Sequence, residues 1–130
     1  MARRGRPRTI PLPGEPVRGS SSGVPVMALF DLLGRRWAMG ILWVLCRIGP
    51  CTFRELQKHC ETLSPSVLNT RLGELHAALL IERTGDGYCP TSMGRQLYEL
   101  LVPLGRWSSK TWARKMRSCG PTATRPLMRA

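Results

Sequence analysis

Residues 64–79, S-P-S-V-L-N-T-R-L-G-E-L-H-A-A-L, are the stretch that decides the fold of this chain. Ser64 has the short hydroxyl side chain that favours a helix N-cap, and Pro65 follows at the first helical position, where its missing N–H is no loss. Leucines then recur at spacings of four, three and four residues, which places them on one side of a helix. These leucines are Leu68, Leu72, Leu75 and Leu79. The pattern predicts a helix that is anchored to a core along its leucines.

The other side of the predicted helix is narrow and polar. It carries small or hydrogen-bonding side chains, with Arg71 and Glu74 on its flanks. The outward-facing residues are Ser66, Asn69, Thr70 and Gly73. Side chains of this kind read the DNA major groove, which is about 12 Å wide. The alternative is an ordinary amphipathic surface helix. The segments on either side of the helix distinguish the two interpretations.

A second, shorter helix is predicted directly before this stretch. Thr52 and Glu55 form a capping box, in which a hydroxyl caps the helix start and a carboxylate stands three residues later. Arg54 and Lys58 lie on the open side of this helix. Its buried side carries Phe53, Leu56 and Cys60. Two short helices joined so tightly, the second with a polar outer face, indicate a helix-turn-helix.

Two strands are predicted directly after the second helix, over residues 80–84 and 88–91. Residues 85–87 between them, Gly-Asp-Gly, contain the Asp-Gly pair that favours a tight hairpin turn. Pro90 cannot donate a hydrogen bond to a ladder, so the second strand is expected to be short or to have a free edge. A helix-turn-helix followed at once by a hairpin is a winged helix, in which the hairpin is the wing.

A helical apolar pattern also runs ahead of the winged helix, from Met27 to Ile48, and Gly49-Pro50 ends it. Glycine lowers helix propensity, so a break is expected near residues 34–36. From Trp37 onward the segment is apolar nearly all round. We therefore expect its second face to meet another subunit.

A last helix is predicted after the hairpin, with Thr91 as its cap. Its apolar residues are Leu97, Leu100, Leu101, Leu104, Trp107 and Trp112. Pro103 is expected to kink this helix or to divide it in two, because proline removes a helical hydrogen bond.

The chain has 130 residues, a length that allows one domain. Its formal net charge of +12 indicates a polyanionic partner, and nucleic acid is a better candidate than a membrane. The excess charge lies at the ends of the chain. Residues 1–25 hold five arginines and one glutamate, and residues 114–130 hold five basic residues and no acid. We predict a flexible basic arm over 1–25, a winged helix-turn-helix domain with dimerisation helices over 26–115, and a disordered basic tail over 116–130.

The arm contains Arg4-Gly5-Arg6-Pro7, which resembles the core of an AT-hook. A narrow minor groove has a strong negative potential that attracts arginine, and glycine keeps the segment slim. We expect Arg4 and Arg6 to lie in the minor groove beside the main site. The alternative is that a four-residue match in an arginine-rich arm contributes only positive charge.

The sequence lacks the motifs that would indicate a metalloprotein, an enzyme or a membrane protein. Five cysteines without C-x-x-C spacing indicate free thiols in a reducing cytoplasm, with Cys89 the most exposed of them. The basic start is no signal peptide, and the longest apolar run, residues 37–46, is about half a membrane span. No phosphate loop or nucleophile elbow is present. We therefore expect no cofactor, no metal, no membrane partner and no catalysis.

The order of these parts resembles a known family. Its markers stand in register at residues 33–37 (L-G-R-R-W), 53–56 (F-R-E-L), 64–68 (S-P-S-V-L), 71–72 (R-L), 74–75 (E-L) and 94–95 (G-R). Over about residues 28–107 the chain resembles the HxlR-type winged-helix transcription regulators. The resemblance implies homodimers that bind near-palindromic operator DNA through a recognition helix, with the first and last helices forming the dimer interface. Some members respond to electrophiles or oxidants.

The resemblance also places the functional residues. Those on the recognition helix are Ser64, Pro65, Ser66, Asn69, Thr70 and Arg71. Arg36 is the basic residue before the family tryptophan, and Arg83 stands at the base of the wing. We expect Ser66, Asn69, Thr70 and Arg71 to read bases, and Arg36, Arg54, Lys58 and Arg83 to hold phosphates. The expected dimer interface comprises Leu33, Trp37, Trp43, Leu104, Trp107 and Trp112.

The chain departs from the family pattern in three places. Leu79 stands where the family has a helix-ending glycine, and the wing is short, with Pro90 in place of an apolar strand residue. The oxidant-sensing members of the family have a cysteine near the start of the first helix. This chain has none there, so we expect no oxidant control.

The predicted function is that of a sequence-specific, homodimeric DNA-binding transcriptional regulator in the cytoplasm, with no effector defined by the sequence. The alternative is a winged-helix protein interaction module, which the excess of positive charge disfavours.

Overall fold

The computed structural model describes residues 10–119, so the arm residues Arg4 and Arg6 and the segment 120–130 lie outside the described part of the chain. The chain divides into two compact units, the first ending at Arg95 and the second beginning at Gln96. Each unit is described by itself.

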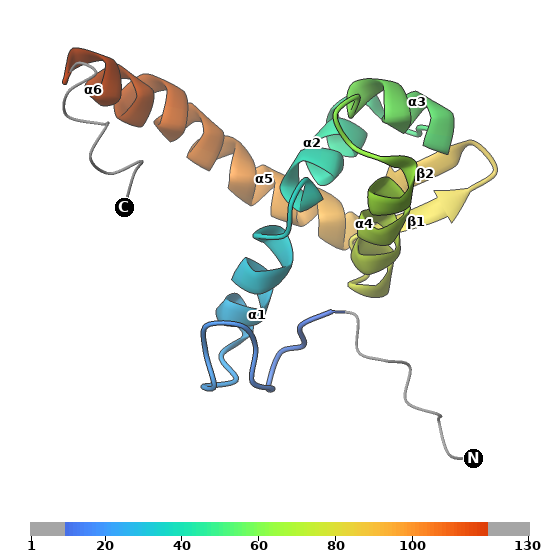
Figure 1. Cartoon of the computed structure of the whole chain (residues 1–130), viewed down its shortest axis with the longest axis horizontal. Coiled ribbons are helices and arrows are strands. Elements are labelled where there is room, and N and C mark those ends of the chain that lie inside the picture. The colour runs from blue at the N-terminus through green and yellow to red at the C-terminus, as the bar shows by residue number, and fades with distance from the viewer. Residues whose placement is uncertain (1–9, 120–130) are drawn as a thin grey trace. The chain divides into compact units, whose positions relative to one another are not determined.

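The first unit is a winged helix-turn-helix, as the sequence predicts (Figure 1). Its elements are α1 (Pro25–Leu33), α2 (Ala38–Ile48), α3 (Phe53–His59), α4 (Pro65–Ala77), β1 (Ile81–Thr84), β2 (Gly87–Pro90) and the start of α5 (Ser92–Trp107). The side chains at its centre come from α2, α3, α4 and β1. They are Ile41, Leu42, Leu45, Leu56, Leu68, Leu72, Leu75 and Ile81, all fully buried. The hairpin is therefore held to the helices by a single apolar core.

Helix α4 begins where its cap residues predict. The Ser64 hydroxyl accepts a hydrogen bond from the Val67 N–H at 3.3 Å, and Pro65 stands at the first helical position. The capping box of α3 is also present, because the Thr52 hydroxyl accepts from the Glu55 N–H at 3.2 Å. The Glu55 carboxylate meets the same hydroxyl at 3.0 Å, so both side-chain bonds of this box converge on Thr52.

The prediction that Leu79 continues the buried leucine row is wrong. Helix α4 ends at Ala77, and Leu79 has a φ of 64° and is 64% exposed. The Leu80 N–H bonds the Leu75 carbonyl, and the Leu79 N–H bonds the His76 carbonyl, each at 3.0 Å. This is a Schellman motif, in which the residue after the cap must be left-handed. The reversal into β1 therefore overrides the helical leucine spacing.

The hairpin forms with a register that shifts its turn by one residue. Thr84 pairs with Gly87, so the two central turn residues are Gly85 and Asp86 rather than the Asp-Gly pair. Pro90 ends β2 opposite Ile81 and is buried, in keeping with a short second strand.

The sequence analysis misses a third backbone partner of the hairpin. Cys51 exchanges two backbone hydrogen bonds with Tyr88, at 2.9 and 2.7 Å, so a single residue before α3 pairs with β2. A bridge of one residue has no periodicity that a sequence pattern could reveal.

The predicted break between the first two helices lies between Leu33 and Ala38. The described part of the predicted arm, residues 10–24, is a closed loop. The Gly14 N–H bonds the Gly23 carbonyl at 2.9 Å, and two further backbone bonds join Val17 to Ser20. Proline and glycine serve here as turn formers, so a composition typical of a flexible arm encodes a folded loop.

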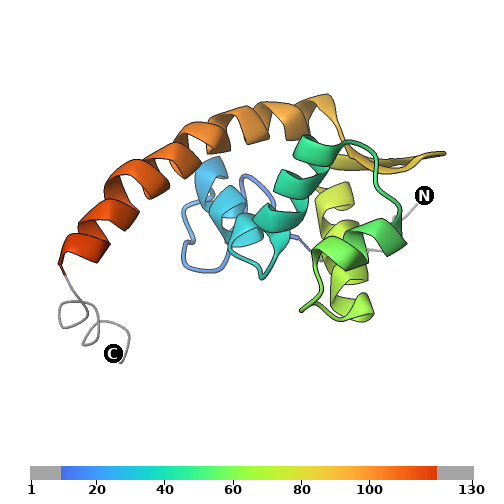
Figure 2. The ribbon, with the colours of Figure 1, turned by 90° about the horizontal axis from the view of Figure 1, so that it is seen from above.

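The second unit is helical. Figure 2 shows the remainder of α5, a π-helical turn (Ser108–Trp112) and α6 (Ala113–Ser118) as one continuous ribbon. Helix α5 runs through Pro103, so the expected division at this proline is wrong. The predicted tail is also wrong in its first residues, because α6 reaches Ser118. Among the helices of residues 10–119, none is both long and apolar enough to cross a membrane.

Two glycines in helices provide a matched test of the packing in the first unit. A Cβ on Gly94 would overlap the Leu80 carbonyl, whereas a Cβ on Gly73 of α4 would meet nothing within 4 Å. We expect Gly94→Ala to lower the free energy of unfolding by about 1–3 kcal/mol through overpacking. Gly73→Ala should raise it by about 0.5–1 kcal/mol through helix propensity. Urea denaturation measures both, and equal effects would contradict the close approach of α5 to the Leu80 carbonyl.

Candidate DNA-binding face

The outer side of α4 is polar and exposed, as predicted. Ser66, Asn69, Thr70 and Gly73 are all exposed. The Thr70 hydroxyl donates to the Ser66 carbonyl at 2.9 Å, and the Ser64 and Ser66 hydroxyls lie 3.3 Å apart. The Asn69 amide has no hydrogen-bond partner within residues 10–119. Asn69 is thus the group on this face whose full hydrogen-bonding capacity is open to a partner.

Four cations predicted to hold phosphates are exposed on three different segments. Arg36 lies before α2, Arg54 and Lys58 lie on α3, and Arg83 lies on β1. The Arg83 guanidinium lies 5.5 Å from the centre of the Tyr88 ring, its cross-strand neighbour. A cation stacked on an aromatic ring keeps its charge and gains a fixed direction.

A groove of about 260 Å³ separates α4 from the hairpin. It is lined by Asn69, Leu72, Gly73, His76, Arg83 and Tyr88. The groove brings together Asn69 and Arg83, which the sequence assigns to the recognition helix and the wing. It also adds His76 and Tyr88 to this face. Tyr88 is missed by the sequence analysis, although its place opposite Arg83 follows once the hairpin register is known.

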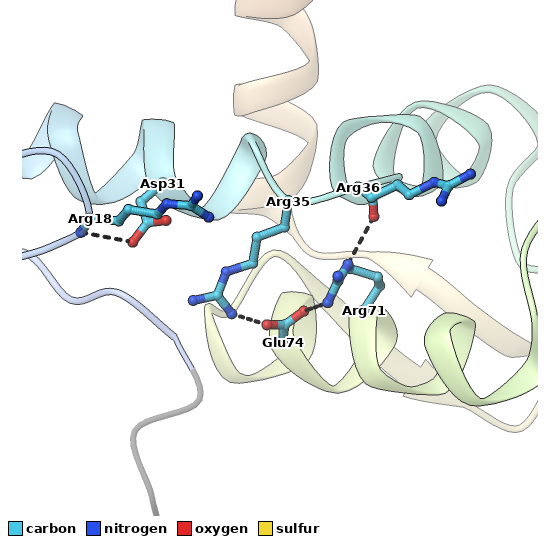
Figure 3. A network of polar contacts seen from close by, with 6 residues as sticks. All are labelled: Arg18, Asp31, Arg35, Arg36, Arg71 and Glu74. Atoms are coloured by element: carbon cyan, nitrogen blue, oxygen red, sulfur yellow. Dashed lines mark hydrogen bonds and ion pairs between the residues drawn. The ribbon is translucent and has the colours of Figure 1, made fainter.

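Arg71 does not point outward with the other residues of α4. Its Nε donates to the Arg36 carbonyl at 2.8 Å, and its NH1 donates to Glu74 Oε1 at 2.6 Å (Figure 3). The other carboxylate oxygen of Glu74 is paired with Arg35. The Glu74 side chain is only 7% exposed. Arg71 therefore contributes to an ion-pair network inside the protein.

This network fixes the turn between α1 and α2 to the recognition helix. Arg35 and Arg36 belong to that turn, which ends at Trp37 with a left-handed φ of 71°. A left-handed tryptophan is unfavourable on its own, so the surrounding contacts have to hold it. Nearby, the Arg18 N–H donates to Asp31 Oδ2 at 3.3 Å, which ties the N-terminal loop to α1 (Figure 3).

The remaining predicted residues lie in contrasting environments. Pro65 is exposed at the start of α4. Of the expected dimer residues, Leu33 is buried within the chain, and Trp37 and Trp43 are half-buried. The exposed members are Leu104, Trp107 and Trp112 of the second unit, each more than half exposed. Within residues 10–119, no group of histidine, cysteine or acidic side chains is arranged to hold a metal ion.

The cysteine thiols of the first unit have raised pKa values. Burial raises the pKa of Cys60, and it raises that of Cys46 against the opposing effect of Arg95. The pKa of Cys51 is raised by burial and by the nearby Glu55 carboxylate. Burial also raises the pKa of Cys89, and the Glu82 carboxylate beside it adds to the shift. A raised pKa lowers the thiolate fraction at neutral pH, and the thiolate is the reactive form.

The ion-pair network can be tested through stability. We expect Glu74→Gln to lower the free energy of unfolding by about 2–4 kcal/mol, because two partly buried guanidinium groups lose their anion. Glu61→Gln, at an exposed position between α3 and α4, is the matched control and should change it by less than about 0.5 kcal/mol. Chemical denaturation measures both. A loss for Glu74→Gln no larger than for the control would show that the network contributes nothing.

Comparison with known proteins assigns this architecture to a family. The chain matches the HxlR-like helix-turn-helix family over residues 32–116. It is 29% identical over 87 residues to the HTH-type transcriptional regulator BH0655 of Halalkalibacterium halodurans, covering 62% of this chain and 77% of that protein.

Solved structures of YodB from B. subtilis are similar to this chain. The quinone-bound form has a TM-score of 0.61 and 30% identity, over 65% of this chain and 96% of that one. The reduced form has a TM-score of 0.59 and 28% identity, over 65% and 89%. The exposed helix α4, its partner α3 and the hairpin are the parts that define such regulators. The chain is a member of the HxlR-type family of DNA-binding helix-turn-helix transcriptional regulators.

Proposed function

We propose that this regulator acts as a homodimer that reads near-palindromic operator DNA by placing α4 in the major groove. The observation that carries the proposal is the outer face of α4, where Ser66, Asn69 and Thr70 are exposed on a helix that is fixed at both ends. Its N-terminus is capped by Ser64. Its C-terminal half is joined through Glu74 to Arg35, in the turn between α1 and α2. A rigid helix with open polar groups is what base reading requires.

The side chains divide between base reading and phosphate binding. Ser66, Asn69 and Thr70 are proposed to contact base edges. The Ser64–Pro65 end of the helix offers its N-terminal N–H groups and positive dipole end to a phosphate. The exposed cations Arg36, Arg54, Lys58 and Arg83 are proposed to contact backbone phosphates. Arg71 is reassigned from base reading to positioning, because Glu74 and the Arg36 carbonyl already hold it.

The dimer interface is proposed to include the apolar side chains of the second unit. Leu104, Trp107 and Trp112 are each more than half exposed, which is unusual for large apolar groups. A homodimer would cover them and would present two copies of α4. In helix-turn-helix dimers the two half-sites lie about 34–36 Å apart, one turn of DNA. Trp37 and Trp43 remain proposed members of the interface on the sequence resemblance.

Two further features stay proposals from the sequence. Arg4 and Arg6 are proposed to add affinity in the minor groove beside the operator. The cytoplasm is the inferred compartment, because a DNA-binding regulator acts where the DNA is. YodB has a quinone-bound form, but we infer no equivalent response of Cys46, Cys51, Cys60 or Cys89, since burial raises the pKa of each of these thiols.

A protein interaction module using the same helix is the second candidate, and salt dependence separates the two. Phosphate contacts release counterions, so DNA affinity should fall steeply as salt rises. A docking face for a protein would show a weaker dependence.

The division between reading and holding gives a specific prediction. The reference operator is the sequence that the wild type selects from randomised DNA. Asn69→Ala should lower affinity for it by about 1–3 kcal/mol, because an amide can form two hydrogen bonds with adenine. The same variant should relax the base preference at one base pair in each half-site. Lys58→Ala, on α3, should weaken all sequences alike and make the salt slope shallower by about one. Binding selection on randomised DNA with both variants measures this. The assignment of α4 as the base-reading helix would be rejected if Asn69→Ala selects the same DNA motif as the wild type while Lys58→Ala selects a different one.

The proposed dimer is tested in the second unit. Trp107→Glu places a charge in the apolar surface and should convert the protein to a monomer in sedimentation velocity. Arg106→Glu is the matched control, because it changes the charge of the neighbouring exposed residue without removing apolar surface. A dimer that survives Trp107→Glu would exclude this surface from the interface.

A further inference from the structure

The first unit contains a cavity that the DNA-binding face does not use. It has a volume of about 350 Å³ and lies between the N-terminal loop, α1, the junction of α4 with β1, and the start of α5. Cavities of about 300–1,000 Å³ are the usual size of small-molecule sites. The cavity is therefore large enough for a molecule of one or two aromatic rings.

The lining of the cavity defines the chemistry of its occupant. Buried Ala28, Leu32 and Leu80 are joined by the partly exposed side chains of Leu12, Leu79 and Met93. Among residues 10–119, the side chains that line the cavity include no charged one. A charged ligand group would lose its hydration there without gaining a partner, so the lining selects a neutral, apolar molecule.

Leu79 is the lining residue with an unusual backbone conformation. The residue occupies the left-handed position that ends α4, where a glycine would satisfy the backbone without strain. A leucine in that conformation costs about 1–2 kcal/mol, and its side chain lies along the cavity. The leucine at position 79, where the sequence resemblance leads us to expect a glycine, therefore supplies one wall of the cavity.

We propose that this cavity binds a small, uncharged apolar molecule, and that the occupant changes the affinity of the protein for DNA. The second part rests on the proposed function. Residues 77–80, which line the cavity, join the end of the recognition helix directly to the first strand of the hairpin. An occupant would contact this junction and favour the placement of the helix and the wing that it contacts best, which is how an allosteric effector acts.

Methionine methyl groups provide a site-specific test of binding. The probe is 1-naphthylamine, a two-ring aromatic amine that is neutral at pH 7, titrated into full-length protein that carries ¹³C-methyl methionine. Met93 lines the cavity, whereas Met39 of α2 and Met116 of α6 do not. We expect a saturable shift of the Met93 methyl signal with Met39 and Met116 unchanged. Equal shifts of all three signals, or none at Met93, would overturn the proposal.

Three variants separate the cavity from general apolar adsorption. Leu79→Gly removes one wall and relieves the left-handed strain, so it should fold at least as well while binding the probe about tenfold more weakly. Ala78→Leu, at another lining position, should weaken binding by filling space. Phe30→Ala, on an exposed part of α1 outside the cavity, should bind as the wild type does. Unchanged probe affinity in both Leu79→Gly and Ala78→Leu would overturn the site.

The effect on DNA is measured with the same probe. Operator affinity of the wild type should change at least threefold at saturating probe, and Leu79→Gly should need about tenfold more probe for the same change. A Met93 shift without any change in operator affinity overturns the regulatory part. Failure of the proposed function is distinguishable from this, because the protein would then not bind the selected operator even without the probe.

Discussion

Glu74 is the buried charge on which the placement of the recognition helix depends. Burying a carboxylate costs several kcal/mol unless it is paired, and here both oxygens are paired with arginines from two segments that lie far apart in the sequence. Arg71 adds a third link, because it also donates to the Arg36 carbonyl. A movement of α4 away from the turn between α1 and α2 would leave an anion or a guanidinium group unpaired. The turn and the recognition helix are therefore held as one body.

This constraint separates the groups that read DNA from the groups that attract it. Arg71 is engaged inside the protein, so the outer face of α4 consists of neutral amide, hydroxyl and glycine positions. The exposed positive charges surround that face on α3, on the hairpin and before α2. Neutral hydrogen-bonding groups discriminate between bases, whereas cations supply a salt-dependent attraction that is the same for every sequence. In the proposed mode of DNA binding, specificity and affinity are thus carried by different side chains.

The sequence predicts the architecture because its main features are local. Caps at Ser64 and Thr52, the leucine spacing of α4 and the turn residues of the hairpin each act within a few positions. The direction of Arg71 cannot be predicted in this way. Its place on the flank of α4 is compatible with either side, and the choice depends on Glu74 and on a carbonyl 35 residues away. The bridge of Cys51 with Tyr88 likewise depends on a partner distant in the sequence. The folded loop over residues 10–24 closes through local backbone bonds, which its proline- and glycine-rich composition does not reveal.

Leu79 links the proposed ligand cavity to the turn that ends α4. The Schellman bonds at the end of α4 require a left-handed residue but no particular side chain. Glycine would end the helix equally well and leave the cavity open on that side. Leucine ends it at some cost in strain and adds an apolar wall. This wall follows the C-terminal end of α4, whereas the proposed base-reading residues Ser66, Asn69 and Thr70 lie in its first half. On this proposal, substitutions at position 79 would change what the cavity accepts while those three residues stay in place, so an effector could change without a change of operator.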